Sequence, residues 1–118
     1  MSPHIKIYYY DKCFIMTNLL NIFTNSKVNI DLDNLENTHK LVWEEAKNGD
    51  LEDYFKRFNS DKNPLSNKKS QDYIKKNKLH TSMSVGDILM VKDDNKENYF
   101  LCRGISWAQL EKNKKNEK

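Results

Sequence analysis

The sequence predicts an α+β fold in which a small antiparallel or mixed sheet carries one main amphipathic helix. An alternating β-branched and aromatic segment, His4–Tyr10, predicts the first strand. Residues 50–58 carry apolar side chains at helical spacing. Two apolar runs, residues 88–91 and 99–102, flank a charged gap and predict an antiparallel hairpin. We therefore expect a single domain over residues 1–110, followed by a charged flexible tail over residues 111–118.

The charge balance limits the classes of partner. The formal net charge is +3, an excess that permits contacts with phosphate groups but does not require them. A mimic of the DNA backbone is excluded, because it needs a large acidic excess. Tyr8, Tyr9 and Tyr10 could stack on bases, but neighbouring strand residues point to opposite faces, so at least one side of this row is expected in the core.

After the first strand, Asp11-Lys12 is interpreted as a two-residue turn into a second apolar segment, residues 13–16. A direct bend into a helix is the alternative. Thr17 is then expected to cap a short helix that ends near residues 25–26. The side chains expected to point inward from this helix are Leu19, Leu20 and Phe23.

The next part of the chain predicts an irregular connection and then a strand. Apolar residues between positions 28 and 35 are separated by Asn and Asp, which is typical of an irregular segment. Residues 40–45 alternate and are interpreted as a strand, with a helix through Ala46 as the competing interpretation. Asn48-Gly49 favours the strand, because a break there leaves little room for a helix.

Residues 50–58 form the clearest predicted helix. Asp50 is placed to accept hydrogen bonds from the first free amides, and the basic residues 56–57 suit the negative end of the helix dipole. The side chains that share one face, at i, i+3, i+4 and i+7, are Leu51, Tyr54, Phe55 and Phe58.

Residues 60–78 are expected to form a long solvated loop, because they contain Pro64, many Asn and Lys residues and few apolar anchors. Ser70 is expected to cap a single turn around Tyr73. The simplest interpretation is a soluble excursion, and the alternative is a surface for an anionic partner. The candidate binding residues are Lys62, Lys68, Lys69, Tyr73, Lys75, Lys76, Lys78 and His80.

The segment from His80 to Asp87 is predicted to be a tight turn that leads into the hairpin. Its hydroxyls and imidazole are expected to bond nearby backbone groups, because the sequence supplies no third group that would orient the imidazole for catalysis. Gly86 is free to adopt a positive φ. The structural residues of this turn are Ser82, Ser84, Gly86 and Asp87.

Beyond this turn, strands over residues 88–91 and 99–103 are expected to pair across residues 93–98, a connection too long for a tight two-residue turn. Trp107 and Leu110 are expected to fold back and cover the sheet.

The remaining chemistry is limited. Cys13 and Cys102 lie in apolar runs and are expected to be reduced and buried. Neither has a second cysteine or a histidine at metal-ligand spacing, and the three isolated glycines form no phosphate-binding loop, so no metal or other cofactor is expected. The apolar runs are too short for a membrane span and no leader is seen, which predicts a cytoplasmic protein without membrane contact.

The predicted helix and turn together carry a resemblance to a known family. The order Leu51-Glu52-Asp53-x-Phe55-x-x-Phe58-Asn59, a loop with Pro64, and then Ser82-Met83-Ser84-Val85-Gly86-Asp87-Ile88 resembles the YodL-like family of small bacterial and phage proteins. Similar segments also occur at residues 5–8, 41–44 and 104–107. The resemblance covers residues 5–107.

The resemblance implies a protein of phages or other mobile genetic elements and transfers no catalytic residues. We therefore expect a non-enzymatic accessory protein of a bacterial host cell that binds a protein partner, such as a host defence complex, and acts as an inhibitor in counter-defence. The alternative is a nucleic-acid-binding accessory protein that uses the lysine-rich loop.

Overall fold

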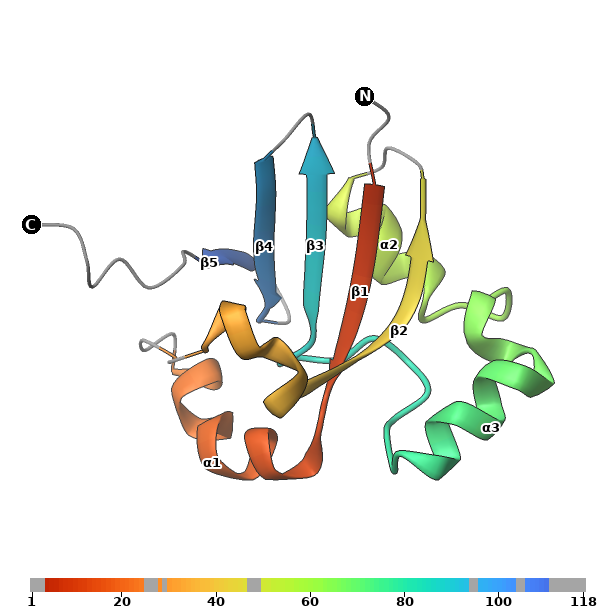
Figure 1. Ribbon diagram of the computed structural model, residues 1–118, viewed down its shortest axis with the longest axis horizontal. Helices are drawn as coiled ribbons and strands as arrows, with labels where there is room; N and C mark the ends of the chain where they lie inside the picture. Colours follow the sequence, from red (N-terminus) through yellow and green to blue (C-terminus); the bar gives the residue numbers. More distant parts are fainter. Residues whose placement is uncertain are drawn as a thin grey trace, which may run out of the picture.

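The computed structural model contains one antiparallel sheet with the strand order β2-β1-β3-β4-β5 (Figure 1). The structure describes residues 4–24, 28, 30–46, 50–93, 96–103 and 106–110. The strands are β1 (His4–Tyr10), β2 (His39–Glu45), β3 (Ile88–Asp93), β4 (Lys96–Cys102) and β5 (Trp107–Leu110). The helices are α1 (Lys12–Phe23), α2 (Leu51–Arg57) and α3 (Lys68–Lys76), with the short 3-10 helices η1 (Leu32–Asn37) and η2 (Pro64–Ser66). The predicted α+β class is confirmed.

The inner strand β1 packs against helices on both of its faces. Ile5, Ile7 and Tyr9 are fully buried on the face covered by α2, η2 and α3. Tyr8 and Tyr10 point to the other face, which is covered by α1 and η1. This alternation confirms that part of the tyrosine row belongs to the core. The structure therefore has a helical layer on each side of the sheet, in addition to the one main helix that the sequence predicted.

The predicted helix at residues 50–58 is confirmed as α2. The Asp50 side chain accepts a hydrogen bond from the Glu52 amide at 2.9 Å, as expected of an N-cap. Tyr54 and Phe58 are buried against the sheet, and Leu51 and Phe55 are partly buried beside them. The strand at residues 40–45 is also confirmed, as β2.

The hairpin turn predicted at Asp11-Lys12 is wrong, because the chain bends there directly into α1. The N-cap is Asp11, which accepts a hydrogen bond from the Phe14 amide at 2.9 Å. Thr17 was predicted to be the cap, but it lies within the helix and donates its hydroxyl to the Cys13 carbonyl at 2.8 Å. The capping carboxylate at Asp11 thus starts the helix two turns earlier than expected.

The inward face of α1 also differs from the prediction. Phe14 and Ile22 are buried against the sheet, whereas Leu19 and Leu20 are exposed. The side chain of Phe23 lies outside what the structure describes, as do residues 25–26. The irregular connection predicted after the helix contains η1, which is held by the buried Leu32 and Leu35.

The long loop predicted at residues 60–78 is wrong over its second half, which forms the nine-residue helix α3. Its N-cap is Asn67, whose side chain accepts a hydrogen bond from the Ser70 amide at 2.8 Å, so Ser70 is not the cap. Ile74 is buried, and the side-chain amide of Gln71 donates a hydrogen bond to the Leu65 carbonyl at 2.6 Å. A single apolar anchor is therefore enough here, because lysine has a good helix propensity and the cap is strong.

The C-terminal hairpin is confirmed, but its connection is shorter than predicted. Asp93 pairs with Lys96, so two residues separate the strands where a longer connection was expected. Trp107 and Leu110 were expected to fold over the sheet, and instead they belong to β5, which pairs with β4 at its edge. The tail predicted at residues 111–118 lies outside the described residues.

Glu45, at the end of β2, ties the sheet to α2. Its carboxylate accepts hydrogen bonds from the Tyr54 hydroxyl at 2.6 Å, from the Trp43 indole at 2.9 Å and from Arg57 at 3.1 and 3.3 Å. Burial alone would raise the pKa of Glu45, but these hydrogen bonds and the positive charge of Arg57 outweigh it and lower the pKa to about 2.

We predict that Glu45→Gln removes part of the acid sensitivity of the fold. Because the folded-state pKa lies below the ordinary value of 4.5, ionised Glu45 stabilises the fold above pH 4.5, and this contribution is lost as the pH falls from 4.5 toward 2. The variant should lose about 1–2 kcal/mol of unfolding free energy at pH 6, after allowance for solvent screening, and much less at pH 2. Urea denaturation at both pH values measures this. Glu36→Gln, at an exposed carboxylate on η1, serves as the control; equal losses in the two variants would contradict the prediction.

Candidate functional site

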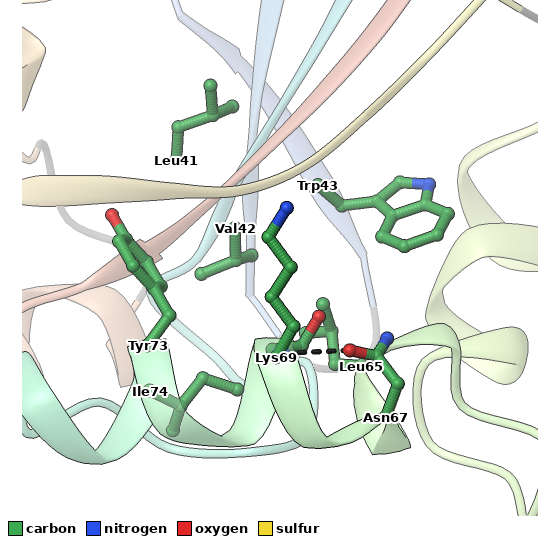
Figure 2. Close-up of a pocket in the computed structure, with 9 residues that line it drawn as sticks. Leu41, Val42, Trp43, Leu65, Asn67, Lys69, Tyr73 and Ile74 are labelled. Atoms are coloured by element: carbon green, nitrogen blue, oxygen red, sulfur yellow. Dashed lines mark hydrogen bonds between the residues drawn. The ribbon is translucent and has the colours of Figure 1, made fainter.

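A groove of about 400 Å³ lies between the edge strand β2 and helix α3 (Figure 2). The strand and the helix run side by side, and Lys69 and Tyr73 extend from the helix toward the strand. Apolar side chains make up much of the wall. The lining residues are Leu41, Val42 and Trp43 from β2, Leu65 from η2, and Asn67, Lys69, Ser70, Tyr73 and Ile74 from α3 and its cap.

Three consecutive residues of β2 line this groove, although alternate strand residues normally face opposite ways. The cause is a shift in register. Ile7 of β1 pairs with Trp43, and the next residue, Tyr8, pairs with Leu41, so Val42 has no partner residue on β1. Such a bulge bends an edge strand and re-aims its side chains. In Figure 2, Val42 lies between β2 and α3, whereas Leu41 points away from α3 and lines the rim of the groove.

The groove combines an open strand edge with exposed apolar groups and one cation. β2 forms an edge of the sheet, and an edge strand presents backbone N–H and C=O groups that can pair with another strand. Leu41 and Tyr73 are 37% and 41% exposed, so the groove has an apolar surface that is open to solvent. Lys69 is the charged residue among the lining side chains. These features suit an extended segment that carries apolar and acidic side chains.

The structure divides the predicted binding residues into three groups. Lys69 and Tyr73 line the groove. His80 lies apart from the groove, packed against Tyr9 and Tyr10. The remaining predicted residues are exposed lysines on or near α3, of which Lys68 pairs with Asp72 at 3.3 Å: Lys62, Lys68, Lys75, Lys76 and Lys78.

The sequence did not point to the β2 side of the groove. Leu41, Val42 and Trp43 were read only as strand residues, because which strand forms an edge depends on pairing between distant segments. Asn67 and Ser70 were missed because α3 was not predicted. The cap pattern of Asn67 followed by a run of good helix formers was the available signal.

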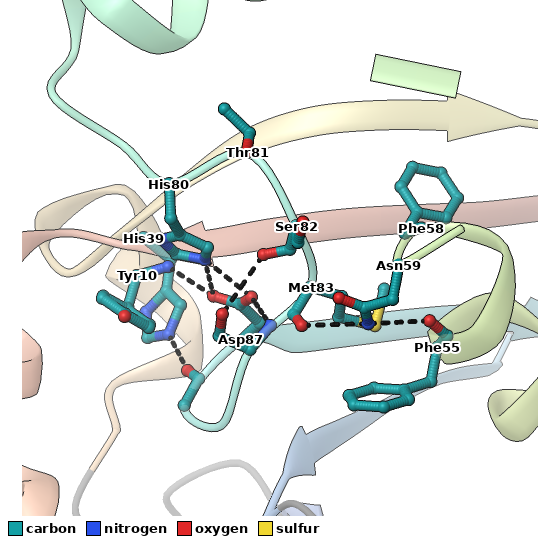
Figure 3. Close-up of polar contacts among 12 residues, drawn as sticks. Tyr10, His39, Phe55, Phe58, Asn59, His80, Thr81, Ser82, Met83 and Asp87 are labelled. Carbon is teal, nitrogen blue, oxygen red and sulfur yellow. Dashed lines mark hydrogen bonds and ion pairs between the residues drawn. The ribbon is translucent and has the colours of Figure 1, made fainter. Parts of the chain in front are cut away.

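Residues His80 to Asp87 form a turn centred on a buried carboxylate, that of Asp87 (Figure 3). Asp87 Oδ1 accepts from the Tyr10 amide at 3.0 Å, and Oδ2 accepts from the Ser84 amide at 2.6 Å. His80 Nε2 lies 2.8 Å from both oxygens. Burial raises the pKa of Asp87, while these three N–H donors favour its ionised form and oppose the rise.

His80 is held as a structural side chain. Its ring centroid lies 4.4 Å from that of Tyr9, in a stacked arrangement, and 4.2 Å from that of Tyr10. A serine nucleophile would have to bond this imidazole, but the Ser84 hydroxyl donates to the Ser82 carbonyl at 3.2 Å. The Asp87 and His80 pair therefore clamps the turn to the end of β1.

A second histidine supports the turn from β2. His39 is fully buried, and its Nε2 lies 2.9 Å from the Gly86 carbonyl, while its Nδ1 lies 2.8 Å from the Thr38 hydroxyl. Burial lowers the pKa of His39 to about 4, although the Gly86 carbonyl acts in the opposite direction. His39 is thus neutral at pH 7, and its Nε2–H donates to Gly86.

The turn also contacts the end of helix α2 and the strand β4. The Asn59 side chain, just beyond α2, donates to the Met83 carbonyl at 3.1 Å. The Gly86 amide donates to the Cys102 carbonyl at 2.8 Å, and the Cys102 amide donates to the Asp87 carbonyl at 2.9 Å. Residues 80–87 therefore join β1, β2, α2 and β4.

The described part of the chain shows no group of three or more His, Cys, Asp or Glu side chains that could hold a metal ion. Within the same residues, no helix has the length and apolar character needed to cross a membrane. Cys102 is buried as predicted. Cys13 was also expected to be buried, but it is exposed, because it lies on the outer side of α1.

The sequence of this chain is similar to that of a viral protein along nearly its whole length. "Uncharacterized protein R785" of Acanthamoeba polyphaga mimivirus is 36% identical over 117 residues, which cover 96% of this chain and 97% of that protein. The chain belongs to the same family as this mimivirus protein. No protein-family model matches the chain, and no solved structure matches it. The resemblance to the YodL-like family stays a prediction.

We predict that Asp87→Ala destabilises the fold by about 2–4 kcal/mol, because it leaves His80 and two buried amides without their acceptor. Ser84→Ala is the matched comparison, since it removes one hydroxyl hydrogen bond, and it should cost about 1 kcal/mol or less. Urea denaturation at pH 7 measures both losses. An Asp87→Ala variant as stable as the wild type would show that the carboxylate does not hold the turn.

Gly86→Ala should also destabilise the turn, by about 1–3 kcal/mol. Gly86 has a φ of +105°, and an added Cβ would lie 2.9 Å from Ile15 Cδ1 and 3.1 Å from Tyr10 Cδ2. Lys78, after α3, has a φ of 57°, so Lys78→Gly should raise stability by up to about 1 kcal/mol. Thermal unfolding of the two variants should give shifts of opposite sign; shifts of the same sign would contradict the backbone argument.

Proposed function

We propose that this protein is a non-enzymatic accessory protein that binds an extended segment of a protein partner in the groove between β2 and α3. The observation that carries the proposal is the open edge of β2 beside an exposed apolar wall. Natural edge strands are usually guarded by charge or covered, because an open edge pairs with other chains. In the centre of β2 the sequence is Leu41-Val42-Trp43, which places no charged side chain at this part of the edge.

The bound segment would add a strand to the sheet. Its backbone would pair with the outer edge of β2, and its side chains would contact Trp43 on one side and Tyr73 of α3 on the other. Lys69 favours a segment that carries an Asp or Glu residue, or a terminal carboxylate, next to apolar side chains. Backbone pairing supplies affinity in this mode, and the side chains supply selectivity.

The family relationship supports a viral setting for this activity. The relative is a mimivirus protein, and the resemblance to the YodL-like family also points to phages and mobile elements. In that setting we propose a host defence complex as the partner and the host cytoplasm as the location. The groove supports protein binding, and the identity of the partner is the more specific part of the proposal.

Nucleic-acid binding is the second candidate, and the exposed lysines of α3 favour it. Tyr73 is 41% exposed between them and could stack on a base. However, Lys68 is paired with Asp72, and the predicted lysines do not converge on the groove. Binding of this kind would weaken steeply with salt, because phosphate contacts release counterions.

We predict that Lys69→Glu lowers the affinity for groove-binding peptides by about tenfold or more, whereas Lys76→Glu has little effect. Both residues are exposed lysines of α3, but only Lys69 lines the groove. A phage-displayed library of random linear peptides, selected on the wild-type protein, would supply the probes. Selected peptides should share an acidic residue among apolar ones, and fluorescence anisotropy measures their affinity for each variant.

Two results of this experiment would contradict peptide binding in the groove. If the library yields no binder, or if binders are unaffected by Lys69→Glu, the groove is not the binding site. A labelled single-stranded DNA oligonucleotide tests the second candidate in the same assay. Binding that falls equally in the two variants and weakens steeply with salt would favour nucleic acid over a peptide.

A further inference from the structure

The outer face of α1 is an apolar surface left open by the described part of the fold. Met16 is 78% exposed, Leu20 is 74% exposed and Leu19 is 42% exposed. Cys13, one turn before Met16, is exposed on the same side of the helix. A helix that is apolar on its outer side as well as its inner side is usually buried on both, so this face indicates an interface.

Two polar side chains of α1 bond to the backbone of the helix itself. Thr17 donates its hydroxyl to the Cys13 carbonyl, and Asn18 donates its amide to the Phe14 carbonyl. Residues 13–23 contain no charged side chain. The face therefore offers a partner apolar contacts and no ion pair, and its best complement is a surface that is itself apolar and uncharged.

The sequence of residues 111–118 does not supply that complement. Residues 111–118 are all polar or charged, so they contribute no apolar side chain to cover α1. A lipid surface fits poorly, because helices that lie in a membrane interface carry several basic residues along their polar face. In α1 the one basic side chain is Lys12, next to Asp11.

We propose that the protein self-associates through α1, so that two copies pair around a twofold axis with their α1 helices antiparallel. A twofold interface brings identical patches together, so each uncharged apolar face meets its own equivalent. The antiparallel arrangement opposes the two helix dipoles and places Lys12 of each copy near the carbonyl end of the other helix, which carries negative partial charge. Arg103 contacts this end too, through the Ile22 carbonyl, from the side of the helix that faces the sheet.

The twofold arrangement determines which residues of the two α1 helices lie close together. Thr17 lies at the middle of α1 (Lys12–Phe23) and would lie close to Thr17 of the second copy. Cys13 lies four residues before Thr17, so the two Cys13 residues would be about 12 Å apart along the helix axis, at about 1.5 Å per residue. An antiparallel pair should therefore form a disulfide through position 17 and not through position 13.

The first test is the mass of the full chain in solution, measured by sedimentation equilibrium over a range of concentrations. The wild type should form a dimer, and Leu20→Lys should raise its dissociation constant by more than about tenfold. Ser66→Lys adds the same charge at an exposed position on η2 and should leave the dimer unchanged. Circular dichroism of each variant confirms that it is folded, as expected for substitutions at exposed sites.

The second test is cross-linking under mild oxidation. The Cys13→Ser, Thr17→Cys double variant should form a disulfide-linked dimer, and the wild type should not. A wild type that stays monomeric at all concentrations overturns the proposal, as does a dimer that Leu20→Lys leaves intact. Cross-linking of the wild type through Cys13 overturns the antiparallel arrangement. Flotation of a monomeric protein with vesicles of neutral and anionic phospholipid would show that the face binds lipid instead.

This proposal stands apart from the groove. α1 packs on the face of the sheet that carries Ile88 and Met90, whereas the groove is built on the helical layer of the opposite face. Lys69→Glu should therefore leave the dimer intact, and Leu20→Lys should leave peptide binding intact.

Discussion

The fold depends on one buried carboxylate, that of Asp87. It is 1% exposed and cannot remain charged in the interior unless N–H groups surround it. Tyr10, His80 and Ser84 provide those groups, and they come from β1 and from both ends of the turn. The requirement to satisfy this charge fixes the path of residues 80–87, and with it the point at which the last three strands enter the sheet.

The groove is rigid for related reasons, because separate contacts hold each of its walls. Glu45 and Arg57 connect the end of β2 to α2. Asn63 joins that helix to the turn and to η2, since its side chain bonds the carbonyls of Phe58 and Thr81. Leu65 and Ile74 then anchor η2 and α3 in the core. A groove held in this way loses little conformational entropy on binding, so more of the contact energy appears as affinity.

The elements with strong local signals were predictable, and those that depend on a single capping residue were not. β1, β2, α2 and the hairpin of β3 and β4 follow their hydrophobic periodicity closely. The start of helix α1 was placed too late, because the cap at Asp11 was read as a turn. Helix α3 was missed, because the cap at Asn67 was read as loop. The groove could not be predicted at all, since it needs the register shift at Val42 and the position of β2 at the sheet edge. The turn motif was located correctly, but its sequence does not reveal that Asp87 is buried.

The order of strands in the sheet has a consequence for how the protein forms on the ribosome. β1 precedes the other strands in the chain, yet it lies inside the sheet between β2 and β3, and its pairing with β3 places His4 opposite Lys92. The nascent chain can form the β1 and β2 pair early, but the buried side of β1 that belongs to β3 stays open until most of the chain has emerged. Contacts between such distant residues form slowly, because long loops must close first. Truncated or stalled chains that end before β3 would therefore leave the β3-facing backbone edge of β1 unpaired, and aggregation is their expected fate.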